Sequence, residues 1–311
     1  MSSIVHEYTQ SWEKGIHRII DCKTCGFKHL YPFPSEEDLN KFYREKYYSE
    51  IKPQDYKELS VEEVEEKTDN VMLNQSYSKI YEKVEKSIDC KSDTELTMID
   101  VGCGNDLLSL YFQRKGWKSI AIEPSKEASN YLKQFGLQVI DKPVDNIKEF
   151  PKENLKFINI QFVLEHLANP RGFLKKAYKA LEPGGILRVC VPNDFSEGQL
   201  AYKEYFNEDY HWVTYPDHIN YFTFESLELL LKEHGFKEVY KISNFPLEFL
   251  LQSGLNYYAE PAYQRMVSKI VNCFESSFRD TGREVKLEEL YEKLAEIGLG
   301  RSIYMYAQKP L

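Results

Sequence analysis

The chain has 311 residues, of which 42% are hydrophobic and 29% are charged, and its formal net charge is -9 at pH 7. This length and apolar content suffice for one large domain with an accessory piece, or for two small domains. The acidic balance argues against a protein that coats nucleic acid and against one that docks on an anionic membrane surface.

No apolar run approaches the length of a membrane span, and the first residues, "MSSIVHEYTQSWEKG", lack the apolar core of a signal peptide. We therefore expect a cytoplasmic protein with no membrane insertion. In such a compartment, cysteines are expected to be reduced thiols rather than a disulfide framework. The chain contains six of them, which are Cys22, Cys25, Cys90, Cys103, Cys190 and Cys273.

Residues 1–65 form a polar and aromatic N-terminal segment, with turn signals in "LYPFPSEEDL". The stretch 60–88 has a helical period and an acidic start, which predicts a helix with one solvated face. From residue 95 to 193, strand-like runs such as "LTMIDVG" and "SIAIEPS" alternate with helical runs such as "EASNYLKQFG". This alternation predicts an α/β fold, with a parallel sheet covered by helices on both faces.

The rest of the chain has its own pattern. Residues 193–222 form a long aromatic segment, and a helix over 225–235 follows, with Thr223 as its N-cap and Gly235 at its end. A strand is expected over 236–242. Residues 243–300 are mainly helical, and "SIYMYAQK" over 302–309 is a last strand.

The stretch "MIDVGCGNDLLSL" combines a buried strand, a glycine turn and the start of a helix. Gly102 and Gly104 let backbone N–H groups approach a ligand closely, and the helix start favours an anionic group. Glu123 ends the next strand, about 20 positions on, where an acid can accept hydrogen bonds from a ribose diol. These residues alone leave three alternatives: a site for a nicotinamide cofactor, a site for S-adenosylmethionine (SAM), or a turn that only packs.

Three runs decide between them by resemblance, namely "IDVGCGND", "AIEPS" and "VLEHLANPRGFLKKAYKALEPGGILRVCVPN". Together they resemble class I SAM-dependent methyltransferases. The resemblance implies a Rossmann-like, doubly wound sheet of about seven strands, mostly parallel with an antiparallel last strand. It further implies a methyltransferase domain over 66–311, with an acceptor-covering segment over 193–222 and a helical insertion over 243–300. The implied cofactor is SAM, with S-adenosylhomocysteine as product.

The resemblance also implies the cofactor-binding residues, which are Asp100, Gly102, Cys103, Gly104, Asn105, Glu123, Pro124, Val144, Asp145, Gln161, Phe162 and His166. The chain departs from the family pattern at Asp106, where glycine is frequent, and at Lys156, where aspartate is frequent. Asp106 suits the first turn of a helix. It could repel the cofactor's carboxylate or face its ammonium group, and we expect binding to survive.

The segment "DCKTCGFKHLYPFPSEEDLNKFYREKYY" resembles the second half of a zinc ribbon found in related methyltransferases. Only the Cys22 and Cys25 pair of the usual four cysteines is present, although His6, His17 or His29 could complete a site. We expect no metal and a degenerate ribbon held by aromatic packing. The packing residues would be Phe27, Tyr31, Phe33, Phe42 and Tyr43.

The methyl acceptor is expected where polar side chains follow the fourth and fifth strands of the parallel sheet. Histidine is a suitable base near neutral pH, and His218 is the first candidate, followed by His166 and His211. The expected acceptor-binding residues are Trp212, Asp217, Asn220 and Tyr221. Glu165 and His166 form no complete divalent-ion site of the quinone-biosynthesis type, because Phe162 stands where a further acid would be needed.

The tail segments "NFPLEFLLQSGLNYY" and "LYEKLAEIGLGRSIYMYA" resemble methyltransferases of surface-polysaccharide synthesis. The resemblance implies O-methylation of a small polar acceptor, a sugar or nucleotide-sugar of a glycan pathway. N- or C-methylation of another small metabolite, and a non-catalytic SAM-binding or interaction protein, are the alternatives.

Overall fold

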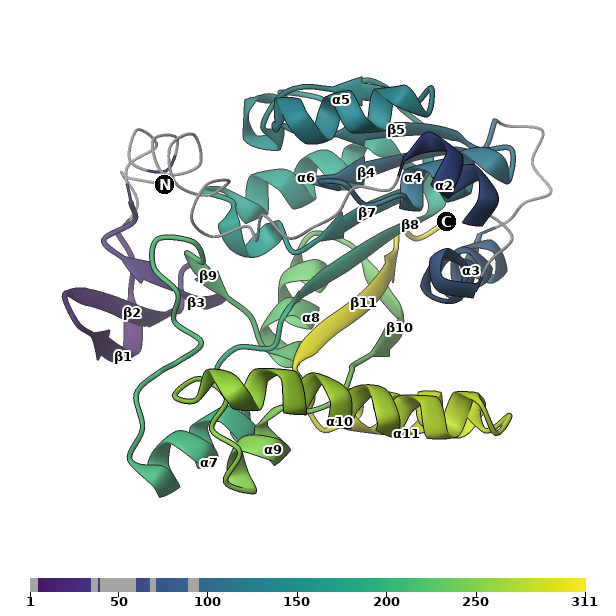
Figure 1. Cartoon of the computed structure of the whole chain (residues 1–311). Helices are drawn as coiled ribbons and strands as arrows, with labels where there is room; N and C mark the ends of the chain where they lie inside the picture. Colours follow the sequence, from purple (N-terminus) through teal and green to yellow (C-terminus); the bar gives the residue numbers. More distant parts are fainter. Residues whose placement is uncertain (1–4, 35–38, 40–59, 68–70, 89–94) are drawn as a thin grey trace. The chain divides into compact units, whose positions relative to one another are not determined.

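A computed structural model of the chain describes residues 5–34, 39, 60–67, 71–88 and 95–311 (Figure 1). Phe42, Tyr43 and Cys90 lie outside these ranges. The chain divides into two compact units, each described by itself. The first comprises Met1–Pro34, Cys190–Leu230 and Tyr240–Met305, and the second comprises Ser35–Val189, Leu231–Val239 and Tyr306–Leu311.

The seven-stranded sheet confirms the expected Rossmann-like fold. Its strand order is β10-β11-β8-β7-β4-β5-β6, and it is mostly parallel with antiparallel strands at the C-terminal end. β4 lies between β5 and β7, so that Asp100 pairs with Ala121 on one side and Asn159 on the other. The strands are β4 Thr97–Val101, β5 Lys118–Ile122, β6 Gln138–Ile140, β7 Leu155–Gln161, β8 Leu181–Pro192, β10 Lys237–Ile242 and β11 Ser302–Gln308.

Three helices of the second unit, α2, α5 and α6, begin at residues whose side chains satisfy their first backbone N–H groups. Ser125 Oγ accepts from Ala128 N–H before α5, and Asn169 Oδ1 accepts from Gly172 N–H before α6. Ser60 and Glu63 form a reciprocal capping box at α2. The helices are α2 Val61–Lys67, α3 Val71–Ser87, α4 Leu108–Arg114, α5 Lys126–Gln134 and α6 Pro170–Ala180.

Two expectations about element boundaries need correction. The stretch 60–88 forms the two helices α2 and α3, described on either side of residues 68–70. "LEPGG", which the helical run was expected to include, instead opens strand β8 at Leu181. Gly184 N–H donates to Lys309 O, and Lys309 N–H donates to Gly185 O. This pairing extends the sheet beyond the helix end.

The first unit contains a second sheet, which the sequence did not reveal. Its order is β1-β2-β3-β9, with antiparallel neighbours. Its last strand comes from the aromatic segment 193–222, far along the chain from the other three. The strands are β1 Tyr8–Lys14, β2 His17–Cys22, β3 Phe27–Tyr31 and β9 Asn220–Tyr221.

Helices make up most of the remaining first unit, including the expected helical insertion. Thr223 Oγ1 accepts from Ser226 N–H, which confirms it as the cap of α8. In the described part of the chain, no helix combines the length and apolar character needed to cross a membrane. The helices are α7 Glu197–Phe206, α8 Phe224–Glu233 (whose end belongs to the second unit), α9 Glu248–Gln252, α10 Pro261–Arg279 and α11 Glu284–Glu296.

Candidate functional site

The predicted cofactor residues all lie in the second unit, in the loops after its parallel strands or, for Asp100 and Gln161, within β4 and β7. β7, β4, β5 and β6 are neighbours, and their pairings are parallel and in register. Loops that follow parallel strands meet at one edge of the sheet. The loop after β4 carries Gly102 to Asn105, the loop after β5 starts at Glu123, and β6 is followed by a 3₁₀ turn over Val144–Asn146.

The glycine turn after β4 requires glycine for two physical reasons. Gly102 and Gly104 have φ values of +65° and +56°, in the left-handed region that other residues rarely adopt. A Cβ on Gly102 would lie 2.3 Å from Val163 Cγ2, which is closer than two carbons can approach. The turn therefore brings the backbone of the β4 loop directly against the loop after β7.

Glu123 connects the glycine turn to the start of α5. One of its carboxylate oxygens accepts from Gly104 N–H at 2.7 Å, and the other accepts from Ser125 N–H at 2.8 Å. The residue is 2% exposed. Its buried carboxylate thus holds the glycine turn against the start of α5.

Asp106 has a local structural role in the turn. Its Oδ1 accepts from Leu108 N–H at 2.9 Å, at the first turn of α4. Burial raises the pKa of Asp106, although this bond and a hydrogen bond with Tyr77 oppose the rise. The acid at this position therefore satisfies the first backbone N–H group of α4 from just before the N-cap residue, Leu107.

Asp100 lies deeper than a direct contact with the cofactor would need. It is 1% exposed, and its two oxygens accept from Asn159 Nδ2 at 2.7 Å and Ser109 Oγ at 3.3 Å. Burial and the nearby Asp106 raise its pKa to about 7, against the opposing effects of Asn159 and Arg188. Asp100 therefore holds β4, β7 and α4 together beneath the glycine turn.

This buried network extends to the sheet edge through residues that the sequence analysis missed. Arg188 on β8 donates to Asn159 Oδ1 at 2.7 Å and to Gln161 Oε1 at 2.9 Å. The buried guanidinium of Arg188 thus positions the side chain of Gln161, a predicted cofactor residue. The signal was present as single polar letters within apolar strands, Asn159 in "LKFINIQFV" and Arg188 in "ILRVCVPN".

The loop after β7 carries two more predicted residues, Phe162 and His166, and the turn after β6 carries Val144 and Asp145. Phe162 has a φ of +53° and is 41% exposed, so its ring is available at the surface of the unit. His166 ends the 3₁₀ turn Leu164–His166, and its Nε2 lies 3.9 Å from Glu165 Oε1. Val144 is buried, and Asp145 beside it is exposed.

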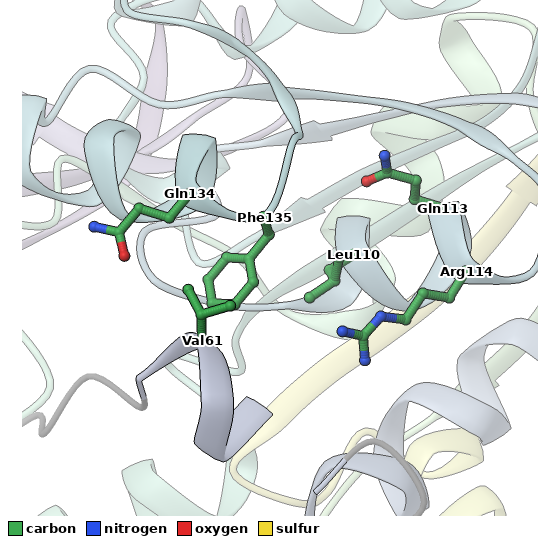
Figure 2. Close-up of a pocket in the computed structure, with 6 residues that line it drawn as sticks. All are labelled: Val61, Leu110, Gln113, Arg114, Gln134 and Phe135. Atoms are coloured by element: carbon green, nitrogen blue, oxygen red, sulfur yellow. The ribbon is translucent and has the colours of Figure 1, made fainter. Parts of the chain in front are cut away.

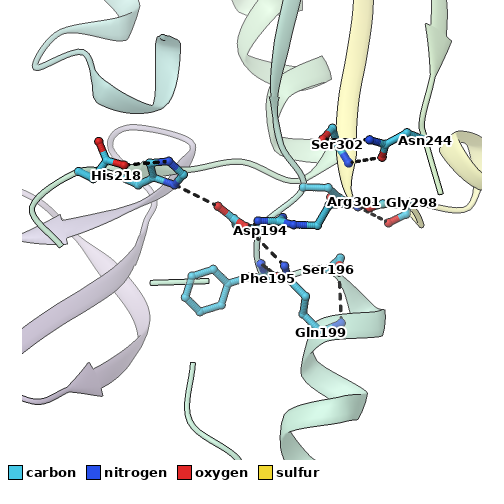
Figure 3. Close-up of polar contacts among 12 residues, drawn as sticks. Asp194, Phe195, Ser196, Gln199, His218, Asn244, Gly298, Arg301 and Ser302 are labelled. Atoms are coloured by element: carbon cyan, nitrogen blue, oxygen red, sulfur yellow. Dashed lines mark hydrogen bonds and ion pairs between the residues drawn. The ribbon is translucent and has the colours of Figure 1, made fainter. Parts of the chain in front are cut away.

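The first unit contains a buried ionic cluster around Asp194, directly after β8 (Figure 3). Asp194 is 1% exposed, and its Oδ1 accepts from Arg301 at 3.0 Å. Its Oδ2 lies 3.8 Å from His218 Nδ1. Burial alone would raise the pKa of Asp194, but Arg301 and His218 outweigh it and hold that pKa below its usual range. His218 Nε2 lies 3.7 Å from Asp217 Oδ2.

The other candidates of the aromatic segment are packed inside the first unit. Trp212, Asn220 and Tyr221 are at most 2% exposed. Tyr221 donates its hydroxyl proton to His218 O at 2.9 Å, so it braces the backbone of the leading base candidate. The ring centroids of His211 and Tyr258 lie 4.2 Å apart. Burial, and to a smaller extent the positive charge of Arg301, lower the pKa of His211 to about 4. A base with so low a pKa is weak at neutral pH, which favours His218 over His211.

A cavity of about 270 Å³ in the second unit does not include the glycine turn or Glu123 among its lining residues (Figure 2). It is formed by the last turns of α4 and α5 and by the start of α2, whereas the glycine turn precedes the first turn of α4. Its lining contains no carboxylate and no histidine, so we assign it no part in the reaction. The lining residues are Val61, Leu110, Gln113, Arg114, Gln134 and Phe135.

Solved structures resemble the chain loosely. One is the 1,6-didemethyltoxoflavin-N1-methyltransferase of Burkholderia thailandensis, at 12% identity and a TM-score of 0.49, covering 97% of this chain and 100% of that one. Another is a SAM-dependent methyltransferase from Archaeoglobus fulgidus, at 16% identity and a TM-score of 0.47, covering 80% of this chain and 100% of that one.

Sequence comparison gives named relatives and a family. The ubiquinone biosynthesis O-methyltransferase of Bradyrhizobium sp. (strain ORS 278) is 32% identical over 117 residues, which are 36% of this chain and 46% of the relative. The protein of the same name in Caulobacter vibrioides is 33% identical over 105 residues, 32% of this chain and 41% of the relative. The chain thus spans less than half the length of these curated relatives. The family model described as "Methyltransferase domain" matches residues 73–241, more than half of the chain. The chain therefore belongs to the methyltransferase domain family.

Proposed function

We propose that the protein transfers the methyl group of SAM to a hydroxyl group of a small polar acceptor. In this reaction the acceptor oxygen attacks the methyl carbon while the carbon–sulfur bond breaks and its electron pair returns to sulfur. The products are a methyl ether, S-adenosylhomocysteine and a proton. The observation that carries the proposal is Glu123, a buried carboxylate beside the positive-φ glycine turn at the edge of the parallel sheet.

A hydroxyl acceptor needs a base for its proton, and His218 is our candidate. The neutral imidazole would take the proton, and the resulting imidazolium would be stabilised by Asp194 at 3.8 Å. Arg301 compensates part of the charge of Asp194.

The class of acceptor is the finer part of the proposal. The resemblance of the tail segments supports a sugar or nucleotide-sugar. The names of the curated relatives support an O-methyltransferase, and ubiquinone biosynthesis favours a phenol-type hydroxyl instead. Incubation with SAM and three panels of acceptors, nucleotide-sugars, hydroxylated phenols and amines, would separate these classes by the mass of the methylated product. Turnover with amines alone would contradict O-methylation.

The base assignment has a direct test. If His218 removes the hydroxyl proton, His218→Ala should lower turnover at saturating acceptor by about 10²–10⁴-fold. SAM affinity should stay nearly unchanged. The matched control is His234→Ala, which removes a histidine just beyond the end of α8 in the other unit.

The alternative role predicts a different result. If His218 only braces its loop, its loss should lower the melting temperature or the acceptor affinity while turnover at saturation is retained. Measuring turnover, SAM affinity and melting temperature on the same preparations decides between the two roles. Near-normal turnover would move the base assignment to His166 or His211.

A further inference from the structure

The N-terminal sheet brings together four side chains that the sequence placed far apart. They are His6, Cys22, Cys25 and His29, and one ligand atom of each lies within 4.8 Å of the other three. His6 Nδ1 is 3.3 Å from Cys22 Sγ and 3.5 Å from Cys25 Sγ. These four side chains are named here the Cys2His2 cluster.

These distances agree with the edges of a tetrahedral metal site. With a zinc–sulfur bond of about 2.3 Å and a zinc–nitrogen bond of about 2.0–2.1 Å, tetrahedral geometry separates sulfur and nitrogen by about 3.6 Å. Two thiolates with two imidazoles are a usual ligand set for zinc. We propose that the Cys2His2 cluster binds one zinc ion.

The imidazole of His29 is prepared for this role. Its Nδ1 lies 2.7 Å from Leu30 O, a backbone acceptor, so Nδ1 carries the proton and donates it there. Nε2 is therefore the lone-pair nitrogen, and it is buried with no hydrogen-bond partner. A metal-binding histidine usually donates its second ring nitrogen to a carbonyl or carboxylate in this way. A buried acceptor nitrogen with no donor is costly unless a ligand such as a metal ion satisfies it.

Backbone bonds hold the other ligands in place. Cys25 N–H donates to Cys22 Sγ at 3.3 Å, a contact that stabilises a thiolate. Gly26 has a φ of +81° and donates to Cys22 O at 2.8 Å, which closes the turn between the two cysteines.

His6 is fixed by its neighbours on both sides. Thr24, inside the cysteine turn, accepts from Glu7 N–H at 3.1 Å and donates to Val5 O at 3.3 Å. Lys23 N–H donates to Glu7 O at 2.8 Å. The residues just before β1, which include His6, are thus held against the turn that carries Cys22 and Cys25.

The surroundings favour a structural ion over a catalytic one. Cys22, Cys25 and His29 are buried, and the ring of Phe33 stacks on His29 with centroids 4.4 Å apart. Four protein ligands leave no open coordination position for a substrate or water. His29 pairs in register with Asn220 of β9, so the ion would stabilise the sheet that holds the end of the aromatic segment.

This proposal is an alternative to the expectation of a metal-free ribbon held by packing alone. Aromatic packing is present, but it surrounds the Cys2His2 cluster rather than replacing it. His17, the third histidine considered from the sequence, is not a member, because its ring stacks on Tyr215 at 3.5 Å.

The test is the metal content of the full chain purified under reducing conditions without chelator. We expect about one zinc per chain for the wild type, and most of it lost in Cys22→Ser and in His29→Gln. The matched controls are His17→Gln, a histidine of the same sheet, and Cys273→Ser, an exposed thiol of α10. Both controls should keep the wild-type zinc content.

A second measurement guards against misfolding of the ligand variants. Metal-stripped wild type, reloaded anaerobically with Co²⁺, should show thiolate-to-cobalt charge-transfer absorption and the visible bands of tetrahedral cobalt. Retained SAM binding would show that the second unit of each variant is folded. The proposal is overturned if reduced, folded wild type carries no zinc and binds no Co²⁺, or if Cys22 and Cys25 are found as a disulfide.

Discussion

Asp106 illustrates how one side chain can replace an expected glycine without loss of the fold. Because its carboxylate accepts from Leu108 N–H, we expect Asp106→Asn, which keeps an acceptor oxygen, to retain wild-type stability. Asp106→Ala should lower the free energy of unfolding by about 1 kcal/mol through the lost cap. Urea unfolding of the three proteins measures this.

The same residue has a predicted effect on the cofactor. Asp106→Gly should leave SAM affinity within about tenfold, or roughly 1.4 kcal/mol, of the wild type. A larger loss measured by calorimetry would mean that the acid faces the cofactor's ammonium group. A larger gain would mean that it repels the carboxylate, and either result would contradict a purely capping role.

Asp100 predicts a pH dependence of stability. Its folded-state pKa is raised to about 7, chiefly by burial, from an ordinary value of 3.8. Between these two values the folded chain binds a proton that the unfolded chain has released. Stability therefore falls as pH rises through this window, by an amount on the order of a few kcal/mol from this group.

The check compares the wild type with Asp100→Asn, a neutral side chain of the same shape. Urea unfolding between pH 4.5 and 8 should show the variant gaining stability relative to the wild type as pH rises. Other titrating groups cancel in this difference. Parallel curves for the two proteins would mean that Asp100 is ionised in the folded state at all these pH values.

The turn that leads into β11 leaves no space for a side chain at one of its two glycines. Gly300 has a φ of +104°, and a Cβ there would lie 1.8 Å from Ser243 Oγ and 2.9 Å from Asn244 O. Gly298 also has a positive φ, of +73°, but has no atom within 4 Å of that position. Asn193 Nδ2 donates to the carbonyls of both glycines at 2.9 Å, which fixes the turn beside the end of β8.

These two glycines form a matched pair for a test. Gly298→Ala should cost about 1–2 kcal/mol of stability, the penalty of a left-handed conformation. Gly300→Ala adds the clash with backbone and Ser243, and should cost about 3 kcal/mol or more. Equal melting temperatures for the two variants would show that the β11 turn adjusts freely.

At the level of the whole molecule, cofactor binding should be visible as stability. With an affinity in the micromolar range, SAM at about 100 times its dissociation constant stabilises the folded chain by about 2.7 kcal/mol. Glu123→Ala should weaken binding by about 1.5–3 kcal/mol, because it removes hydrogen bonds to a charged group. The same SAM concentration should then raise its melting temperature far less.

Two controls make this thermal-shift experiment specific. Glu123→Gln keeps one acceptor oxygen and should give an intermediate shift, whereas Asp145→Asn, on an exposed turn of the same unit, reports whether that predicted contact contributes. No shift and no calorimetric binding for the wild type would contradict the SAM assignment itself.

The sequence determined the fold class because its signals are local. Strand and helix periods, the cap at Thr223 and the glycine turn each depend on a few neighbouring residues, and each predicts an element that the structure contains. The cofactor-binding residues were implied by the resemblance to methyltransferases, and their binding role stays a prediction. The parallel pairing of β7, β4, β5 and β6 agrees with their lying near one edge of the sheet. Element boundaries at "LEPGG" were less certain, because strand pairing across the sheet extends β8 beyond its own local preference.

Only the tertiary structure decided the contacts between distant residues. The Asp100–Asn159–Arg188 network forms only when β4, β7 and β8 are paired side by side. The sequence does not reveal which of these polar residues contact one another. His218 gains Asp194, and Asp194 gains Arg301, only when the ends of β8 and β11 meet in the first unit. The Cys2His2 cluster likewise depends on hydrogen bonds that join residues 5 and 7 to Thr24. The sequence by itself therefore determined the elements, whereas long-range pairing decided which polar side chains face one another.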